Sequence, residues 1–378
     1  MTSRSVVRFG IVGTGRMAVR MAQSLSLLEG GQIVAVASGS PERAKRFAEA
    51  FGIPRAHEAV AALLADESVD VVYVANATAE HAGTTLLALK AGKSVLCEKP
   101  LATGAKESLE IGSAARESGC LVMEAMWTLF LPAYQRFSQL VASQRSAGPL
   151  HLYADFGYPI SAGEQQRLVT PGRGAGVLLD RGVYPLALAL KLFGAVRRID
   201  GCVNLTADGV DEHAALHLLH EAGDVSQIAV SLRVLLQNRA AVSSASGLVE
   251  LEPPVIGAES VRSFAHRPAG PAADPLVTAG MKAGIGNALR RRPELRRLNR
   301  LRQRGHVEHQ PYGADPFLPM LGHFCEQVRA GKTASEVMPP GLSTAVLDLV
   351  DRARELPGSR PPVATTPLTS EEERQGAS

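Results

Sequence analysis

The sequence is short of several residue types, and each shortage excludes a class of protein. It has only four cysteines and one tryptophan in 378 residues, and 4% of its residues are aromatic. Cys97, Cys120, Cys202 and Cys325 show none of the close spacings typical of metal sites or disulfide frameworks. We therefore expect no metal site and interpret all four cysteines as reduced core thiols.

Long apolar runs are missing as well. No run approaches the roughly 20 apolar residues of a membrane span, and Met1–Arg8 lacks the apolar core of a signal peptide. With 46% hydrophobic residues, the chain still has ample material for two hydrophobic cores. These features lead us to expect a cytoplasmic, two-domain protein without a membrane span.

The first part of the chain, 1–125, alternates apolar runs with helical segments. Continuous apolar strands are typical of a parallel sheet that is covered on both faces. This pattern predicts an α/β fold with a Rossmann-type, doubly wound sheet. The expected strands are Val6–Val12, Ile33–Ser38, Val69–Ala75, Ser94–Cys97 and Cys120–Glu124, and the later helices are His81–Ala91 and Ala105–Ser118.

A glycine-rich turn follows the first strand. Gly13 and Gly15 suit a tight turn, and Ala18 is small enough for the next helix to pack closely on the sheet. Amides at the start of that helix would face a pyrophosphate, so Arg16 and Met17 join the predicted dinucleotide site. The alternative is that the glycines serve only the turn.

The end of the second strand indicates which dinucleotide is bound. An NAD site would place an acidic residue there, whereas this chain has Ser38, Ser40 and Arg43, which suit a 2′-phosphate. We therefore predict NADP rather than NAD. The competing interpretation is that Ser40 caps the next helix and Arg43 is a solvated surface residue.

An apolar run between Val95 and Ala102 ends in the charged tripeptide Glu98-Lys99-Pro100. Ligands of open α/β sheets bind at the carboxyl ends of the strands. We therefore expect Lys99 to lie in the ligand-binding crevice and to take part in the reaction there.

Residues 126–356 are predicted to form a second, α+β domain, because many strands follow one another without intervening helices. Such an open, mainly antiparallel sheet, covered by helices on one face, would leave its other face for a second subunit, so we expect a homo-oligomer. The expected helices are Pro132–Ser143, Val177–Phe193, Pro316–Ala330 and Gly341–Glu355, and the strands are His151–Tyr158, Ile199–Leu205, Glu212–His220, Val225–Val234, Ala240–Ser246 and Leu248–Leu251.

The helix expected at Val177–Phe193 carries a second set of polar residues. Asp180 and Tyr184 are four residues apart and would lie on one helical face, able to contact one ligand. A nearby ammonium, such as that of Lys99, would favour the phenolate of Tyr184. In the alternative interpretation, Asp180 complements the helix dipole, Tyr184 is a core residue and Lys99 pairs with Glu98.

A basic segment, 289–304, contains eight arginines and one glutamate, a local charge of +7. Since the formal total is +3, the rest of the chain carries −4. The segment would contact nucleic acid, an anionic surface or an acidic substrate, or it is a solvated helix with an apolar stripe. The absence of interleaved aromatic residues disfavours single-stranded nucleic acid. We expect the tail, 357–378, to be disordered.

Four separate motifs now point to a known family. They are the Gly-x-Gly-x-x-Ala turn, the run from Ala88 to Ala102, Met123-Glu-Ala-Met-Trp127, and Leu179-Asp-Arg-Gly-Val-Tyr-Pro185. In these motifs the chain resembles the glucose-fructose oxidoreductase, inositol dehydrogenase and rhizopine catabolism (Gfo/Idh/MocA) family. Within that family it is most similar to dimeric dihydrodiol dehydrogenases and NADP-dependent xylose dehydrogenases.

The resemblance implies an NADP-dependent oxidoreductase that acts on a sugar or cyclic diol. Lys99 and Tyr184 would be the proton-transfer pair, with Asp180 accepting a substrate hydroxyl, and the Lys99-Pro100 bond is often cis in relatives. The rival function is a non-catalytic NADP sensor of the same fold. The cofactor would contact Gly13, Gly15, Arg16, Met17, Ser38, Ser40, Arg43, Ala75, Asn76, Thr78, His81, Glu98, Lys99 and Trp127.

The chain departs from the family pattern at three places. Asn76-Ala77-Thr78 follows the third strand, where relatives usually have Thr-Pro-Asn or a similar triplet. Leu129 stands where close relatives have arginine, and Arg181 replaces a common isoleucine next to Asp180. A lost guanidinium beside the cleft implies an altered substrate or weakened catalysis.

Overall fold

A computed structural model describes residues 6–172, 174–266 and 305–357. The basic segment at 289–304 and the expected disordered tail from residue 358 onward lie outside the described residues. In the three described ranges, none of the helices has both the length and the hydropathy that crossing a membrane requires.

The N-terminal half folds around a six-stranded sheet in the order β3-β2-β1-β4-β5-β6, and every pair of neighbours is parallel. All four residues of β4 are buried, as expected for a strand that is covered on both faces. The predicted Rossmann-type fold is confirmed. Its elements are β1 (Val7–Val12), α1 (Arg16–Ser26), β2 (Gly31–Ala37), α2 (Pro41–Phe51), β3 (Arg55–His57), α3 (Val60–Leu64), β4 (Val71–Val74), α4 (His81–Lys90), β5 (Ser94–Cys97), α5 (Ala105–Ser118) and β6 (Val122–Glu124).

Among the residues that the structure describes, the second sheet has eight strands in the order β14-β13-β12-β11-β7-β10-β9-β8, and only β7 and β10 pair in parallel. The predicted α+β class is confirmed. Its elements are α6 (Pro132–Ser143), β7 (His151–Gly157), α7 (Ala162–Leu168), α8 (Val183–Phe193), β8 (Val196–Leu205), β9 (Asp211–His220), β10 (Val225–Ser231), β11 (Ala240–Ser244), β12 (Gly247–Leu251), β13 (Ser260–Ala265), β14 (His306–His309), α12 (Leu318–Arg329) and α13 (Pro340–Arg354).

The helix predicted at Val177–Phe193 is not one regular α-helix. Its first turn, Leu178–Gly182, is π-helical, and α8 begins only at Val183. A π-turn changes the spacing of side chains along the helix axis. Asp180 and Tyr184 therefore do not sit one above the other on a single α-helical face, as the spacing of four had indicated.

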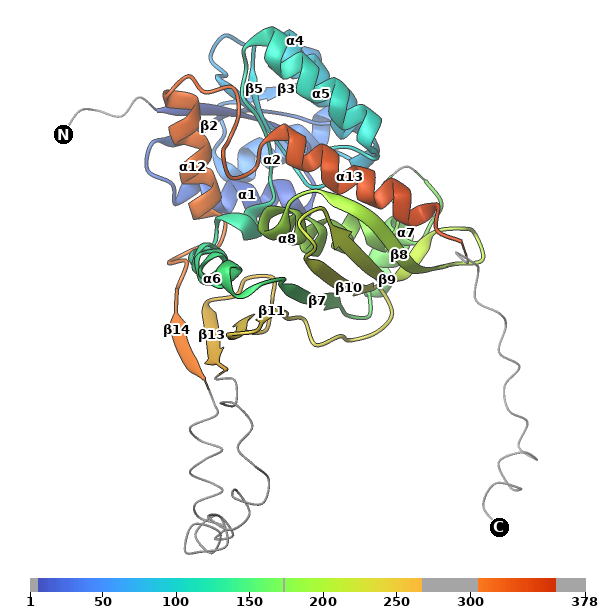
Figure 1. The fold of residues 1–378 in the computed structure, drawn as a ribbon. Helices are drawn as coiled ribbons and strands as arrows, with labels where there is room; N and C mark the ends of the chain where they lie inside the picture. The colour runs from blue at the N-terminus through green and yellow to red at the C-terminus, as the bar shows by residue number, and fades with distance from the viewer. Residues whose placement is uncertain (1–5, 173, 267–304, 358–378) are drawn as a thin grey trace, which may run out of the picture.

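The last two helices return from the second half to the first (Figure 1). Asp351 on α13 accepts a 2.9 Å hydrogen bond from the backbone amide of Ala105, and Thr344 lies 2.9 Å from the hydroxyl of Ser108 on α5. On α12, the ring of Phe324 packs 6.2 Å from that of Phe9 in β1. The two sheets are thus held together by segments far apart in the sequence.

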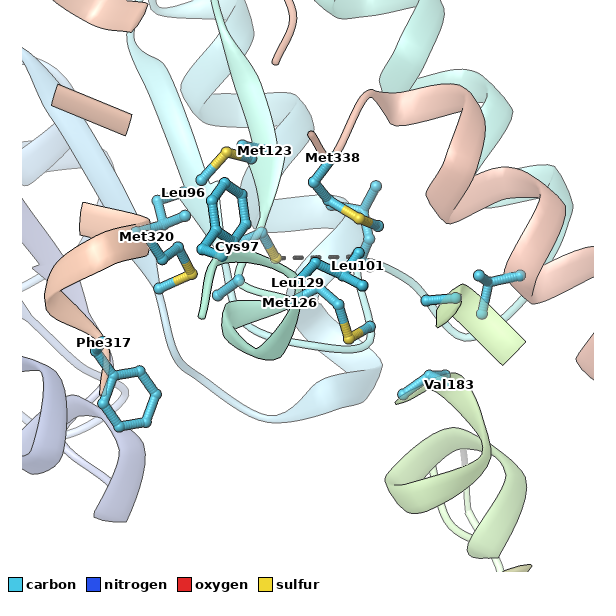
Figure 2. Packing of buried hydrophobic residues seen from close by; sticks show 14 of the residues in the cluster. Leu96, Cys97, Leu101, Met123, Met126, Leu129, Val183, Phe317, Met320 and Met338 are labelled. Atoms are coloured by element: carbon cyan, nitrogen blue, oxygen red, sulfur yellow. Dashed lines mark hydrogen bonds between the residues drawn. The ribbon is translucent and has the colours of Figure 1, made fainter. Parts of the chain in front are cut away.

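The core between them is rich in methionine and leucine. Figure 2 shows Leu129 near Met126 and Leu101, with Met338 and Phe317 of the same core cluster on opposite sides of this group. Leu129 is 4% exposed, so the side chain in place of the relatives' arginine belongs to the apolar core.

The prediction for the cysteines is wrong at one position. Cys97, Cys120 and Cys325 are buried thiols, but Cys202 is exposed. It lies on β8, the last strand in the order of the second sheet, where one edge has no neighbouring strand among the described residues.

Candidate functional site

The predicted site lies along one edge of the first sheet. Parallel register aligns Val12 of β1 with Val74 of β4, Val74 with Cys97 of β5, and Cys97 with Glu124 of β6. The residues that follow these strand ends therefore form a row at the carboxyl edge. Ligands of open α/β sheets bind at this edge.

The glycine turn after β1 is required by close backbone contact. Gly13 has a φ of +114°, and a Cβ there would lie 2.3 Å from the carbonyl oxygen of Ala75. Gly15 is the N-cap of α1 and provides no side-chain cap, so the first amides of the helix are left for a ligand. This geometry matches the predicted pyrophosphate site.

Two adjoining cavities follow the strand ends, with volumes of about 470 Å³ and 610 Å³, and both are lined by Asn76 and Ala79. Together they offer enough volume for a dinucleotide. Of the predicted cofactor residues, the first cavity is lined by Gly15, Arg16, Met17, Ala75, Asn76, Thr78, His81, Glu98 and Lys99, and the second by Gly13, Ser38 and Asn76.

Asn76 gives an independent indication that a polar ligand fits here. Its amide nitrogen donates to Thr84 at 2.8 Å, whereas its Oδ1 is buried without a hydrogen-bond partner among the described residues. An unpaired buried acceptor is costly, and a ligand that donates a hydrogen bond would satisfy it. The residues present therefore fit a nicotinamide dinucleotide.

At the first cavity, Lys99 from the N-terminal half meets Asp180 from the C-terminal half. The Nζ atom of Lys99 donates to the backbone oxygen of Asp180 at 2.6 Å and lies 3.2 Å from its Oδ1. The Lys99-Pro100 peptide bond is cis, as the resemblance implied. The alternative pairing of the Lys99 ammonium with Glu98 is wrong, because the carboxylate of Glu98 accepts from the backbone amide of Lys99 instead.

The two groups hold each other in their charged forms. Burial is the largest single effect and favours the neutral amine of Lys99, but Asp180, Tyr184 and Glu98 together outweigh it and raise the pKa of Lys99 above its ordinary value. Burial likewise opposes the carboxylate of Asp180, and Lys99 together with Arg167 outweighs it, so the pKa of Asp180 is lowered. At neutral pH the cavity therefore contains an ammonium and a carboxylate.

Asp211 positions the π-turn that carries Asp180. This buried residue at the start of β9 accepts the backbone amide of Leu178 at 2.7 Å, and its other oxygen binds Arg354 at 2.8 Å. A Cβ on Gly176, whose φ is +104°, would lie 2.4 Å from the Asp211 carboxylate. No sequence pattern pointed to Asp211, because it is 31 positions from Asp180 and belongs to no motif.

Tyr184 lies beside Lys99 but does not line the first cavity. The Lys99 Nζ is 5.1 Å from the centroid of the Tyr184 ring, which also packs edge-on against Phe156 at 5.9 Å. Burial raises the pKa of Tyr184, and the opposing effect of Lys99 does not overcome it. The expected shift toward phenolate is therefore wrong in net direction, and Tyr184 is a neutral phenol at pH 7.

Glu98 and His81 fix the turn around Lys99. Glu98 is 5% exposed and accepts the hydroxyl of Tyr73, and burial raises the pKa of its carboxyl. The Nδ1 of His81 lies 2.8 Å from the oxygen of Pro100, and because a carbonyl only accepts, Nδ1 carries the proton. Burial lowers the pKa of His81, which favours its neutral form.

At the opposite end of the two cavities, Ser38 lines the wall, whereas neither Ser40 nor Arg43 does. Ser40 caps α2 by accepting the amide of Arg43 at 3.3 Å, and it donates to Glu42 at 2.8 Å. The side chain of Arg43 is exposed. The structure therefore shows the capping role for Ser40, and the predicted 2′-phosphate contacts stay a prediction.

The cofactor contact predicted for Trp127 also stays a prediction, and the structure brings further residues to the site. Trp127 does not line either cavity, and its ring packs 4.9 Å from that of Phe317. Arg167, Thr170 and Gly174 line the first cavity, although the only signal for them is a polar, glycine-rich stretch. Gly174 has a φ of +93°, and a Cβ there would lie 2.6 Å from Thr78.

Comparison with known proteins gives matches over both halves. Residues 7–126 match the family model described as the GFO_IDH_MocA oxidoreductase family with an NAD-binding Rossmann fold, and residues 134–250 match the GFO/IDH/MocA C-terminal domain. Trans-1,2-dihydrobenzene-1,2-diol dehydrogenases of Mus musculus and Homo sapiens are each 34% identical over 251 residues, which is 65% of this chain and 74% of theirs.

Two solved structures share the fold. KijD10, a 3-ketoreductase from Actinomadura kijaniata in complex with NADP and TDP-benzene, has a TM-score of 0.75 at 24% identity, covering 95% of this chain and 100% of that one. The aldose-aldose oxidoreductase from Caulobacter crescentus complexed with glycerol has a TM-score of 0.74 at 23% identity, covering 93% and 98% of the respective chains.

Proposed function

Because the chain belongs to the GFO/IDH/MocA family of NAD(P)-dependent oxidoreductases, we propose that it transfers a hydride between C4 of the NADP nicotinamide and a carbinol or carbonyl carbon of a sugar or cyclic diol. The observation that carries this proposal is the contact between Lys99 and Asp180 in the first cavity, where Nζ lies 3.2 Å from Oδ1. It joins two charged groups from different halves of the molecule beside the dinucleotide site.

Each residue has a separate role in the proposed reaction. The cofactor, when bound, would supply a hydride in its reduced form, NADPH, or accept one in its oxidised form. Asp180 is an ionised acceptor for a substrate hydroxyl, and the neutral phenol of Tyr184 holds the proton that a carbonyl oxygen receives during reduction. The Lys99 ammonium, 5.1 Å from the Tyr184 ring, stabilises the phenolate that remains.

The proposal is tested by following NADPH absorbance with a panel of sugars, diols and keto sugars. The variants Tyr184→Phe and Lys99→Met should each lower kcat by about 100 to 10,000-fold, because each removes a proton-transfer group. NADPH binding should change little. Tyr153→Phe is the matched control, since Tyr153 is an exposed tyrosine that stacks on His151 in β7.

Two results count against the proposal. Near-normal kcat in both variants would remove Tyr184 and Lys99 from the reaction. Absence of turnover on every compound, together with normal NADPH binding, would favour the sensor function instead.

A further inference from the structure

One carboxylate in the first cavity faces three cations. The Oδ1 of Asp180 lies 3.2 Å from Lys99 and 3.4 Å from Arg167, and its Oδ2 lies 3.7 Å from the Nε of Arg181. The other acid that lines the cavity is Glu98, whose carboxylate is already bound to Tyr73 and to a backbone amide. Glu164 on α7 interacts with Arg16, Arg167 and Arg181. With Lys99, these arginines make four cations, which outnumber the three acids Asp180, Glu98 and Glu164.

Arg181 cannot turn toward a ligand. Its side chain is 1% exposed, its Nη1 donates to the backbone oxygens of Tyr158 and Ser231, and its guanidinium lies 3.7 Å from the centroid of the Tyr158 ring. A buried guanidinium needs a nearby counter-charge, and Asp180 is the carboxylate beside it. Asp180 therefore already serves in part as the counter-ion of Arg181.

Arg167 is the cation that remains available. Its side chain is 52% exposed, and its contacts with Asp180, at 3.4 and 3.5 Å, are longer than the 2.7–2.9 Å or so of a well-formed charge-assisted hydrogen bond. It extends from α7 into the cavity that Lys99 and Asp180 line. The planar fork of an arginine matches the oxygens of a carboxylate or phosphate.

The other exposed arginine of this cavity has a different position. Arg16 follows the glycine turn at the start of α1, where a pyrophosphate would sit, and it pairs loosely with Glu164 at 3.5 Å. Arg167 contacts Asp180 instead, at the end of the cavity where the reaction is proposed. A ligand group at Arg167 would therefore belong to the substrate rather than to the pyrophosphate.

We propose that Arg167 is a specificity residue that binds an anionic group of the substrate, so that this protein acts on a hydroxy or keto compound, such as a sugar, that bears a carboxylate or phosphate. The inference rests on the proposed function, because it assigns the substrate class of the same site. An anionic substrate neutralises the excess positive charge and also favours the oxidised nicotinamide ring, which is itself cationic.

The test measures binding to the protein–NADP complex by calorimetry with three ligands that differ at one carbon: glucose, glucuronate and glucose 6-phosphate. At least one anion should bind about tenfold to a hundredfold more tightly than glucose, as expected for a hydrogen bond to a charged group. The two anions distinguish a carboxylate from a phosphate as the natural group. Higher ionic strength should reduce the preference.

In Arg167→Gln the preference should disappear while glucose and NADP bind as before. Arg198→Gln is the control, because Arg198 is an exposed arginine on β8 that pairs with Asp200, so this variant removes the same charge elsewhere. Equal affinity for all three ligands in the unmodified protein, including none detectable, would overturn the inference. So would weaker NADP binding in Arg167→Gln as its only change, which would make Arg167 a cofactor contact.

These outcomes differ from failure of the proposed function. Rapid turnover of neutral sugars or diols with no preference for anions would refute the inference and leave the oxidoreductase proposal intact. Tight, Arg167-dependent binding of an anion with no turnover on any compound would count against the oxidoreductase proposal and retain only the anion-binding role of Arg167.

Discussion

The two ends of the dinucleotide site are built in different ways. At the reaction end, Lys99 and Asp180 come from separate halves of the chain, are 17% and 14% exposed, and already contact each other. At the ribose end, Ser40 and Arg43 lie on one helix start, and their polar groups interact with one another and with Glu42. A buried charge needs a partner that the fold already holds beside it. An exposed charge is solvated and can pair with a ligand when the ligand binds.

Removing the shared carboxylate should have the largest effect. In Asp180→Ala, Lys99 and Arg181 lose their common counter-charge, so we expect kcat/KM to fall by about 100-fold or more and the free energy of unfolding to fall by about 3 kcal/mol. Steady-state kinetics and urea unfolding measure the two effects. Asp200→Ala, at an exposed pair on β8, is the control and should change neither; an equal loss in both variants would contradict this account.

A second buried acid should make stability depend on pH. Burial raises the pKa of Glu124, at the end of β6, to about 7, while its Oε1 accepts the amide of Leu101 at 3.1 Å. Because the folded state holds this proton more tightly than the unfolded state, stability is fully present below the ordinary carboxyl pKa and is lost as the pH rises through about 7. The loss should reach about 3 kcal/mol.

Glu124→Gln should remove this dependence, because the amide keeps an acceptor for the backbone amide of Leu101 and does not ionise. The variant should match the unmodified protein near pH 5 and be more stable at pH 8. Thermal unfolding at both pH values measures this, and parallel curves for the two proteins would contradict the prediction.

The ribose end should respond more weakly. Arg43→Ala should raise the dissociation constant for NADP about tenfold, because an arginine–phosphate contact is lost. NAD binding should not change, since NAD lacks the 2′-phosphate. Fluorescence titration with both dinucleotides measures the difference. If the unmodified protein bound NAD as tightly as NADP, the predicted role of Ser38, Ser40 and Arg43 would be wrong.

The smallest effect is expected at Glu42. Its carboxylate accepts the hydroxyl of Ser40 at 2.8 Å and would repel a nearby phosphate. Glu42→Gln should therefore tighten NADP binding about twofold to fivefold, the range of an exposed charge interaction. Glu49→Gln, at an exposed position later in α2, is the control for net charge and should leave the affinity unchanged.

Some features of the two ends of the site were predictable from the sequence and others were not. The strand ends that carry Gly13, Asn76 and Lys99 were predictable, because continuous apolar runs and glycine turns depend on local chemistry. Arg167 and Asp211 were not, since their roles depend on contacts between segments far apart in the chain. The π-turn before Val183 was also missed, because helical periodicity does not reveal one extra residue in a turn.

The direction of the Tyr184 pKa shift shows the same limit. The sequence predicted the neighbouring ammonium of Lys99 and its effect, but not the depth of burial, which opposes that effect and outweighs it. The net direction follows from the packing around the Tyr184 ring, including its edge-on contact with Phe156, and no motif encodes that packing.

A crystal structure with NADP bound would test the central proposal most directly. The account predicts that the nicotinamide ring enters the cavity lined by Lys99 and Asp180, with a position beside its C4 from which a substrate oxygen reaches the Tyr184 hydroxyl at about 2.6–3.2 Å. A nicotinamide ring outside that cavity, or a Tyr184 hydroxyl that no substrate oxygen beside C4 could reach, would contradict it.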